Sequence, residues 1–184
     1  DLIRPALYQA HHKIESLTGQ GPLQPYMVAG LMEKIGPVLA ARKDRFVLVS
    51  MAAALTIPDL RERGCGDWPL IRIMPNTPSA IGEGVIFYTC DGVIAEEEAA
   101  FLENMAGAGR LPPLDDHLMD AGSAVAGCGP AFVDLFIEAL ADGGVACGLP
   151  RAAAMELAAQ TVAGSARLVL ESGRDPGVLK DAVC

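Results

Sequence analysis

Ile71-Arg72-Ile73-Met74-Pro75-Asn76-Thr77-Pro78 is the stretch that decides how this 184-residue chain folds. Its first half is an apolar run typical of a strand. Its second half is a turn held by two prolines, because proline fixes φ and disfavours helix in the residue before it. Asn76 and Thr77 are the only side chains of that turn able to hydrogen-bond a ligand. A rigid polar turn after a strand often binds ligands in α/β proteins, although an isolated turn of this kind is more often structural.

A second strand-like run lies upstream, at residues 46–49, and Thr56 after it is suited to cap a short helix. A strand, a short helix and a second strand form a right-handed crossover, in which the two strands run parallel. Because parallel strands end at one edge of a sheet, we expect Met51-Ala52-Ala53 to lie beside Met74-Pro75-Asn76. The run 46–49 is apolar throughout, so both of its faces should be covered. This arrangement favours a binding role for Asn76.

The rest of the chain divides into a mixed part and a helical part. Apolar residues recur at helical spacing over 28–39, and residues 84–89 are typical of a strand. A helix at 96–105 and an edge strand at 110–114, which holds two prolines, complete the mixed part. No strand is predicted after Asp115, and the helices expected there are 120–125, 130–142, 151–171 and one that follows Asp175-Pro176.

The helices at 130–142 and 151–171 are apolar on nearly all sides. In the first of them only Asp134 and Glu138 form a narrow polar line. A helix of this kind must be covered all round, and one small subunit cannot cover two of them. The pattern therefore predicts a helical dimer interface, with a compact monomeric bundle as the alternative.

Composition argues against several classes of protein. The net charge is −9, the pI is near 4.7 and no basic cluster occurs, so nucleic-acid binding is not expected. The five cysteines form no C-x-x-C pair and the three histidines lack metal-ligand spacing, so neither a disulfide framework nor a metal site is expected. Gly, Pro or charge interrupts every apolar run well short of about 18 residues, so no membrane span is expected and a cytoplasmic location is predicted.

Beyond these patterns, the sequence resembles pyrroline-5-carboxylate reductase from about residue 24 to residue 184. Several motifs carry the resemblance, in the order expected of that family. They are Arg72-Ile73-Met74-Pro75-Asn76-Thr77-Pro78, Gly82-Glu83-Gly84, Gly127-Cys128-Gly129-Pro130-Ala131-Phe132, Glu138-Ala139-Leu140-Ala141-Asp142-Gly143-Gly144-Val145, Gly148-Leu149-Pro150-Arg151, Ala158-Ala159-Gln160-Thr161 and Asp175-Pro176-Gly177-Val178-Leu179-Lys180-Asp181.

The resemblance implies an α/β fold, in which a partial dinucleotide-binding, Rossmann-like parallel sheet is followed by an all-helical dimerisation domain. The implied domains are residues 1–114, of which 1–25 are an irregular leader, and residues 115–184. The implied reaction is the NADPH- or NADH-dependent reduction of 1-pyrroline-5-carboxylate, a cyclic imine, to L-proline, the last step of proline synthesis. A homodimer, or a larger assembly of such dimers, would form through the helical domain, and partner helices near 173–181 would close the pocket.

The resemblance also implies where the ligands bind. Asn76 and Thr77 would contact the substrate. It suggests no catalytic acid or base, and His117 is expected at the surface. The residues expected at the cofactor are Leu23, Gln24, Pro25, Met51, Ala52, Ala53 and Asn76.

Some features of the family are absent from this sequence. Residues 1–25 hold no glycine-rich turn for the cofactor pyrophosphate, and the chain stops before the family's Ser/Thr-Pro-Gly-Gly-Thr loop. Ala54 stands where the family favours Gly, Ala126 and Cys128 where it favours Ser, and Phe132 where it favours Tyr. The alternative function is therefore a non-catalytic helical dimerisation module.

Overall fold

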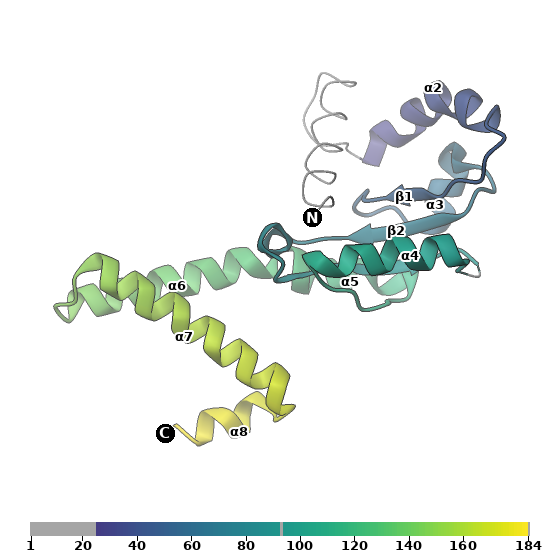
Figure 1. Cartoon of the computed structure of the whole chain (residues 1–184). Helices are drawn as coiled ribbons and strands as arrows, with labels where there is room; N and C mark the ends of the chain where they lie inside the picture. Colours follow the sequence, from purple (N-terminus) through teal and green to yellow (C-terminus); the bar gives the residue numbers. More distant parts are fainter. Residues whose placement is uncertain (1–24, 93, 184) are drawn as a thin grey trace. The chain divides into compact units, whose positions relative to one another are not determined.

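The computed structural model describes residues 25–92 and 94–183, so nearly all of the leader predicted at 1–25 lies outside the described residues. Contacts divide the chain into two compact units, one up to Pro130 and the other Ala131–Cys184. The domain limits predicted from the sequence, 1–114 and 115–184, stay a prediction. The elements in chain order are η1 Pro25–Met27, α2 Val28–Ala40, β1 Leu48–Ser50, α3 Ile57–Leu60, η2 Arg61–Cys65, β2 Leu70–Met74, η3 Thr77–Ile81, β3 Gly84–Val85, β4 Phe87–Cys90, α4 Glu96–Met105, η4 Ala106–Ala108, β5 Gly109–Arg110, η5 Asp116–Leu118, α5 Met119–Gly122, η6 Ser123–Gly127, α6 Gly129–Ala146, α7 Arg151–Ser172 and α8 Pro176–Asp181 (Figure 1).

The main sheet of the first unit has the strand order β1-β2-β4. Strand β1 pairs with β2 in parallel, and Ser50 lies opposite Arg72, which confirms the predicted parallel pair. Strand β1 begins at Leu48 rather than at residue 46. The Phe46 ring instead packs against the Trp68 ring before the two strands meet, with 5.4 Å between the ring centroids.

The prediction of a single strand at 84–89 is wrong. Strand β3 pairs in parallel with β5 in a separate two-stranded sheet, whereas β4 pairs antiparallel with β2. Ile86, between β3 and β4, is fully buried. The β3–β5 pairing brings two glycines together, since a Cβ added at Gly109 would lie 2.0 Å from the carbonyl oxygen of Gly84. The predicted α/β class is confirmed, but the main sheet is mixed rather than purely parallel.

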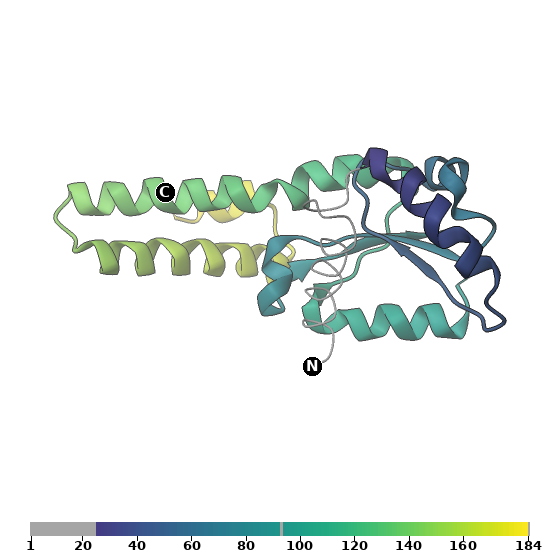
Figure 2. The same ribbon diagram turned by 90° about the horizontal axis from the view of Figure 1, so that it is seen from above.

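Helices cover both faces of the main sheet, with α2 on one side and α4 on the other (Figure 2). Successive residues of a strand point to opposite faces, so Leu70 belongs to the same core as Met32 of α2, and Ile71 to the same core as Leu102 of α4. Val49 of β1 is 39% exposed. The prediction that residues 46–49 are covered on both faces is therefore wrong for Val49.

Local capping signals in the sequence are reproduced in the structure. Thr56 is the N-cap of α3: its hydroxyl accepts from the Asp59 N–H at 3.2 Å, and its own N–H donates to the Asp59 carboxylate at 2.9 Å. The Thr56 hydroxyl also donates to Asp59 Oδ2 at 2.6 Å, and this hydrogen bond first, then the one from the Thr56 N–H, lowers the pKa of Asp59. Asp175 is the N-cap of α8, and its Oδ1 accepts from the Gly177 N–H at 2.7 Å.

The second unit is a hairpin of two long helices. Helices α6 and α7 lie side by side near the turn that joins them in both views (Figures 1 and 2). Their contact is made of small residues, since the buried core there consists of Ala141, Ala154 and Ala158. The predicted helices at 130–142 and 151–171 are confirmed, with α6 extending to Ala146.

Candidate functional site

Strands β1 and β2 both end at one edge of the main sheet, which we call the carboxyl edge and define as residues 51–54 and 74–77. The register places Ser50, the last residue of β1, opposite Arg72 of β2, so the two segments that follow leave the sheet together. Ala52 is buried and its N–H donates to the Ser50 hydroxyl at 3.3 Å, whereas Ala53 is exposed. At residues 52–54 the carboxyl edge therefore consists of small side chains and backbone groups.

Ala54 is held in a conformation that alanine disfavours. Its φ is +56°, and in the described part of the chain it is the one residue other than glycine with positive φ. For an L-residue the left-handed region costs roughly 1–2 kcal/mol. The resemblance noted in the sequence implies glycine at this position, and glycine would adopt this φ without the steric cost.

Asn76 uses its amide to hold the turn after β2. Its Oδ1 accepts from the Val85 N–H at 2.9 Å, and its Nδ2 donates to the Ala126 carbonyl at 3.0 Å. One side chain thus connects the turn to β3 and to η6, a role that sequence reasoning missed because both partners are distant along the chain. An amide nitrogen carries two hydrogens, so one donor of Asn76 can still serve a ligand. The predicted ligand contacts of Asn76 and Thr77 stay predictions, and Thr77 is exposed.

The turn is further fixed by close packing around η3. Gly82 ends this helix with φ +82° and donates its N–H to the Ser79 carbonyl at 3.2 Å. A Cβ added at Gly84 would lie 2.0 Å from Ser79 Oγ. A side chain at Gly84 would therefore clash with Ser79, and one at Gly82 would be strained by its positive φ.

A buried arginine lies just before the turn. Arg72 is 0% exposed, and its Nη1 donates to Asp116 Oδ1 at 2.9 Å while its Nη2 donates to Asp120 Oδ1 at 3.3 Å. The second oxygen of Asp116, Oδ2, accepts from the Ile57 N–H at 2.8 Å. We call these groups the Arg72 network: Arg72, Asp116, Asp120 and the Ile57 amide. The signal in the sequence was an arginine inside the apolar run Leu70-Ile71-Arg72-Ile73-Met74.

Three residues expected at the cofactor lie near the start of the described region. Leu23 and Gln24 are outside the described residues. Pro25 begins η1 and is half-buried. The cofactor role of all three stays a prediction.

The carboxyl edge itself, residues 51–54 and 74–77, offers neither a metal site nor an exposed thiol. Within residues 25–92 and 94–183, no cluster of three or more His, Cys, Asp or Glu could hold a metal ion. Burial raises the pKa of the Cys65 and Cys90 thiols, which disfavours their reactive thiolate forms. His117 is exposed, as expected.

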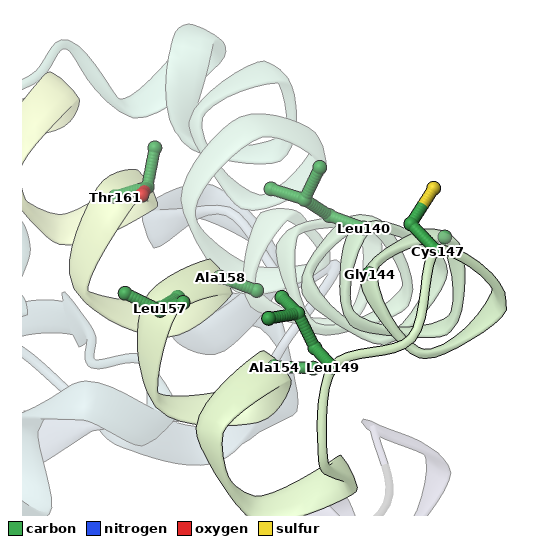
Figure 3. A pocket seen from close by; sticks show the side chains of 9 residues that line it. Leu140, Gly144, Cys147, Leu149, Ala154, Leu157, Ala158 and Thr161 are labelled. Carbon is green, nitrogen blue, oxygen red and sulfur yellow. The ribbon is translucent and has the colours of Figure 1, made fainter.

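The helical unit carries an apolar groove of about 530 Å³ beside the turn between α6 and α7 (Figure 3). Gly144 lets the two helices approach closely, since a Cβ added there would lie 3.2 Å from Leu149 Cδ1 and 3.3 Å from Ala154 Cβ. The residues that line the groove are Leu140, Gly143, Gly144, Cys147, Leu149, Ala154, Leu157, Ala158 and Thr161. Larger apolar side chains of α6 are exposed to solvent: Phe132 is 68% exposed, Leu135 63% and Phe136 59%.

Comparison with known proteins relates both units to one family. A family model described as pyrroline-5-carboxylate reductase dimerisation matches residues 116–184. The pyrroline-5-carboxylate reductase of Pisum sativum is 43% identical over 162 residues, which cover 88% of this chain and 58% of that protein. That of Escherichia coli (strain K12) is 37% identical over 157 residues, which cover 84% of this chain and 58% of that protein.

A solved structure extends the relationship to the fold. The crystal structure of Plasmodium falciparum pyrroline carboxylate reductase with NADP bound superposes with a TM-score of 0.77 at 30% identity, covering 89% of this chain and 65% of that one. This chain thus spans 58% of the length of the two curated relatives. The resemblance seen in the sequence is confirmed: 88% of this chain is similar to pyrroline-5-carboxylate reductase, and residues 116–184 match the dimerisation region of that family.

Proposed function

We propose that this chain acts in the NAD(P)H-dependent reduction of 1-pyrroline-5-carboxylate to L-proline. The observation that carries the proposal is the extent of the relationship. Reductases of this family match 88% of the chain, so the similarity includes both the carboxyl edge of the sheet and the helical hairpin. A domain that served dimerisation alone would need only the second of these.

The described residues suit the nicotinamide end of the cofactor better than its pyrophosphate. A pyrophosphate needs free amides at a helix N-terminus. At the start of α3 these amides are already bonded, since the Ile57 N–H donates to Asp116 and the Asp59 N–H to Thr56. At the carboxyl edge, by contrast, Ala52 and Ala53 have small side chains that allow a flat ring to approach the backbone.

The proposed contribution of the carboxyl edge is orientation. When bound, NADPH or NADH supplies the hydride for the C=N carbon of the imine. The Thr77 hydroxyl and the second amide hydrogen of Asn76 would orient the nicotinamide or the imine, with the reacting atoms about 3–3.5 Å apart. Residues 51–54 and 74–77 include no acid or base, so this edge positions the reactants and does not itself transfer a proton.

We infer that the helical unit pairs with a second copy of the chain. Phe132, Leu135 and Phe136 are each more than half exposed, and the groove between α6 and α7 is lined largely by apolar side chains. Exposed apolar side chains on this scale mark an interaction surface. A second copy would bury them, and partner helices near 173–181 would then close the active site.

A membrane is the other environment that could cover an apolar helix. By length and composition alone, the stretch Asp116–Ala146 could cross one. Asp134, Glu138 and Asp142 recur every four residues along α6, however, and form an acidic line on it. A protein partner can leave such a line in water, whereas a lipid interior cannot. We therefore propose a homodimer in the cytoplasm.

Two measurements test the proposal. NADPH fluorescence titration should show micromolar binding, and incubation with NADPH and 1-pyrroline-5-carboxylate should yield proline. A dimer in sedimentation that binds no NADPH would favour the alternative, a non-catalytic dimerisation module. Activity confined to hydroxyacids would contradict the choice of substrate, and comparison of NADPH with NADH would give the cofactor preference.

A further inference from the structure

The Arg72 network joins three segments that meet at the carboxyl edge. Arg72 lies in β2 two residues before Met74, its last residue. Ile57 opens α3, directly after the loop that leaves β1. Asp116 opens η5, and it bonds both of the others through separate carboxylate oxygens, at 2.9 Å to Arg72 and 2.8 Å to Ile57. All of these residues belong to the first unit.

A buried guanidinium requires an explanation. Removing a charge from water is unfavourable unless good partners replace the water. The Arg72 network supplies such partners only in part, since Arg72 Nε is buried with no hydrogen-bond partner among the described residues. An apolar residue would fill this place in β2 without that cost, so the arginine does something other than fill the core.

Residues 116–127 contact both the start of α3, which follows the loop after β1, and the turn after β2. At its start, Asp116 holds Arg72 and the first amide of α3. Near its end, the Ala126 carbonyl accepts from Asn76 Nδ2 at 3.0 Å. The run η5-α5-η6 therefore touches the loop after β1 at one point and the turn after β2 at another.

We propose that Asp116 is a positioning residue, which sets the loop 51–56 and the turn 74–77 at the spacing that the nicotinamide site requires. The Arg72 network fixes the far end of the loop through Ile57 and the base of the turn through Arg72. The ligand part of this proposal rests on the proposed function, whereas the mechanical part does not.

The substitution Asp116→Asn tests the proposal with little change of shape. An amide offers one acceptor and one donor, so it must turn its NH2 toward either the Arg72 guanidinium or the Ile57 N–H. One of the two bonds is therefore lost. The matched control is Asp91→Asn, because Asp91 is exposed and its carboxylate pairs with Arg61, Nε to Oδ2 at 3.0 Å, and neither residue belongs to the Arg72 network.

Hydrogen exchange and NADPH titration are measured on the full chain for wild type and both variants. Urea unfolding curves first establish that each protein is almost fully folded under the conditions of these measurements. In Asp116→Asn, exchange at 51–57 and 74–77 should rise at least tenfold more than exchange in β2 and β4, and the Kd for NADPH should rise at least tenfold. Asp91→Asn should stay within twofold of wild type in both measurements.

Two kinds of result would overturn the proposal. The first is an increase in exchange that is uniform over the first unit, or equal in Asp91→Asn, because either would show a general loss of stability. The second is an unchanged Kd in Asp116→Asn. If the wild-type chain itself binds no NADPH, the proposed function fails, and the pattern of exchange alone then decides whether Asp116 holds the loop and the turn.

Discussion

Replacing Ala54 with glycine should stabilise the first unit. The left-handed φ of +56° costs alanine roughly 1–2 kcal/mol. Glycine adopts this φ freely but loses roughly 0.5–1 kcal/mol more backbone entropy on folding. Ala54 is exposed, so losing its methyl group removes little packing. The difference leaves a net gain of about 0.5–1 kcal/mol for Ala54→Gly.

Trp68 is the single tryptophan of the chain and lies half-buried in the first unit, so its fluorescence during urea unfolding reports on this unit. With a urea slope of about 1–3 kcal/mol per M, the gain corresponds to a midpoint shift of a few tenths of a molar upward. The matched control is Ala53→Gly, at an exposed neighbour without positive φ. It should lower the midpoint, because there glycine only loses entropy.

The sign of the difference between these two variants is the decisive quantity. If Ala54→Gly lowered the midpoint as much as Ala53→Gly, the argument that Ala54 is strained would be refuted. If both variants left the midpoint unchanged, the loop after β1 would not be ordered enough to contribute to folding. That result would also argue against the proposal that this loop holds the nicotinamide in a defined position.

Three other predictions follow from single features of the two units. Gly84→Ala should destabilise the first unit by about 1–3 kcal/mol, because its Cβ would lie 2.0 Å from a serine hydroxyl, whereas Gly107→Ala, with nothing within 4 Å, should be neutral or slightly stabilising in the same urea assay. Phe136→Glu should shift the chain toward monomer in sedimentation without lowering the Trp68 midpoint, because this side chain is 59% exposed in the single chain; an unchanged dimer would contradict the proposed interface. The hydrogen bond from Arg45 is the first cause that lowers the pKa of Glu98 in the folded chain. The ionised Glu98 therefore contributes to the free energy of unfolding above its unfolded pKa near 4.5, and this contribution is lost as pH falls through the lower folded pKa. Urea midpoints between pH 6 and pH 3 should therefore fall less steeply in Glu98→Gln than in wild type, and equal slopes would refute this assignment.

Features that depend on neighbouring residues could be predicted from the sequence. The Thr56 cap, the helices and the parallel β1–β2 pair all rest on short-range periodicity or capping chemistry. The split of 84–89 could not be predicted in this way, because it depends on Gly84 meeting Gly109, and no local pattern encodes that contact. Strand β1 was placed two residues early because apolar composition alone does not distinguish Phe46, which packs on Trp68, from a strand residue.

The candidate site shows the same division. The carboxyl edge follows from two strands in parallel, so its location could be predicted. The contacts that fix its shape could not, because Asn76 bonds Ala126, 50 residues away, and Arg72 bonds Asp116, 44 residues away. The arginine within an apolar strand was nevertheless visible in the sequence. A buried charge requires a partner, so that residue alone predicts a carboxylate brought there by the fold.

The proposed association and the proposed ligand positioning would depend on different residues of this chain. The fully buried core between α6 and α7 consists, in the described residues, of three alanines, and each alanine buries little apolar area. Such a hairpin gains most of its burial only when a second copy covers its outward side chains, so its folding should be coupled to association. The Arg72 network, in contrast, lies wholly within the first unit. A substitution at Phe136 can therefore separate the subunits while the Arg72 network stays intact, and Asp116→Asn can loosen the carboxyl edge while the apolar surface of α6 stays intact.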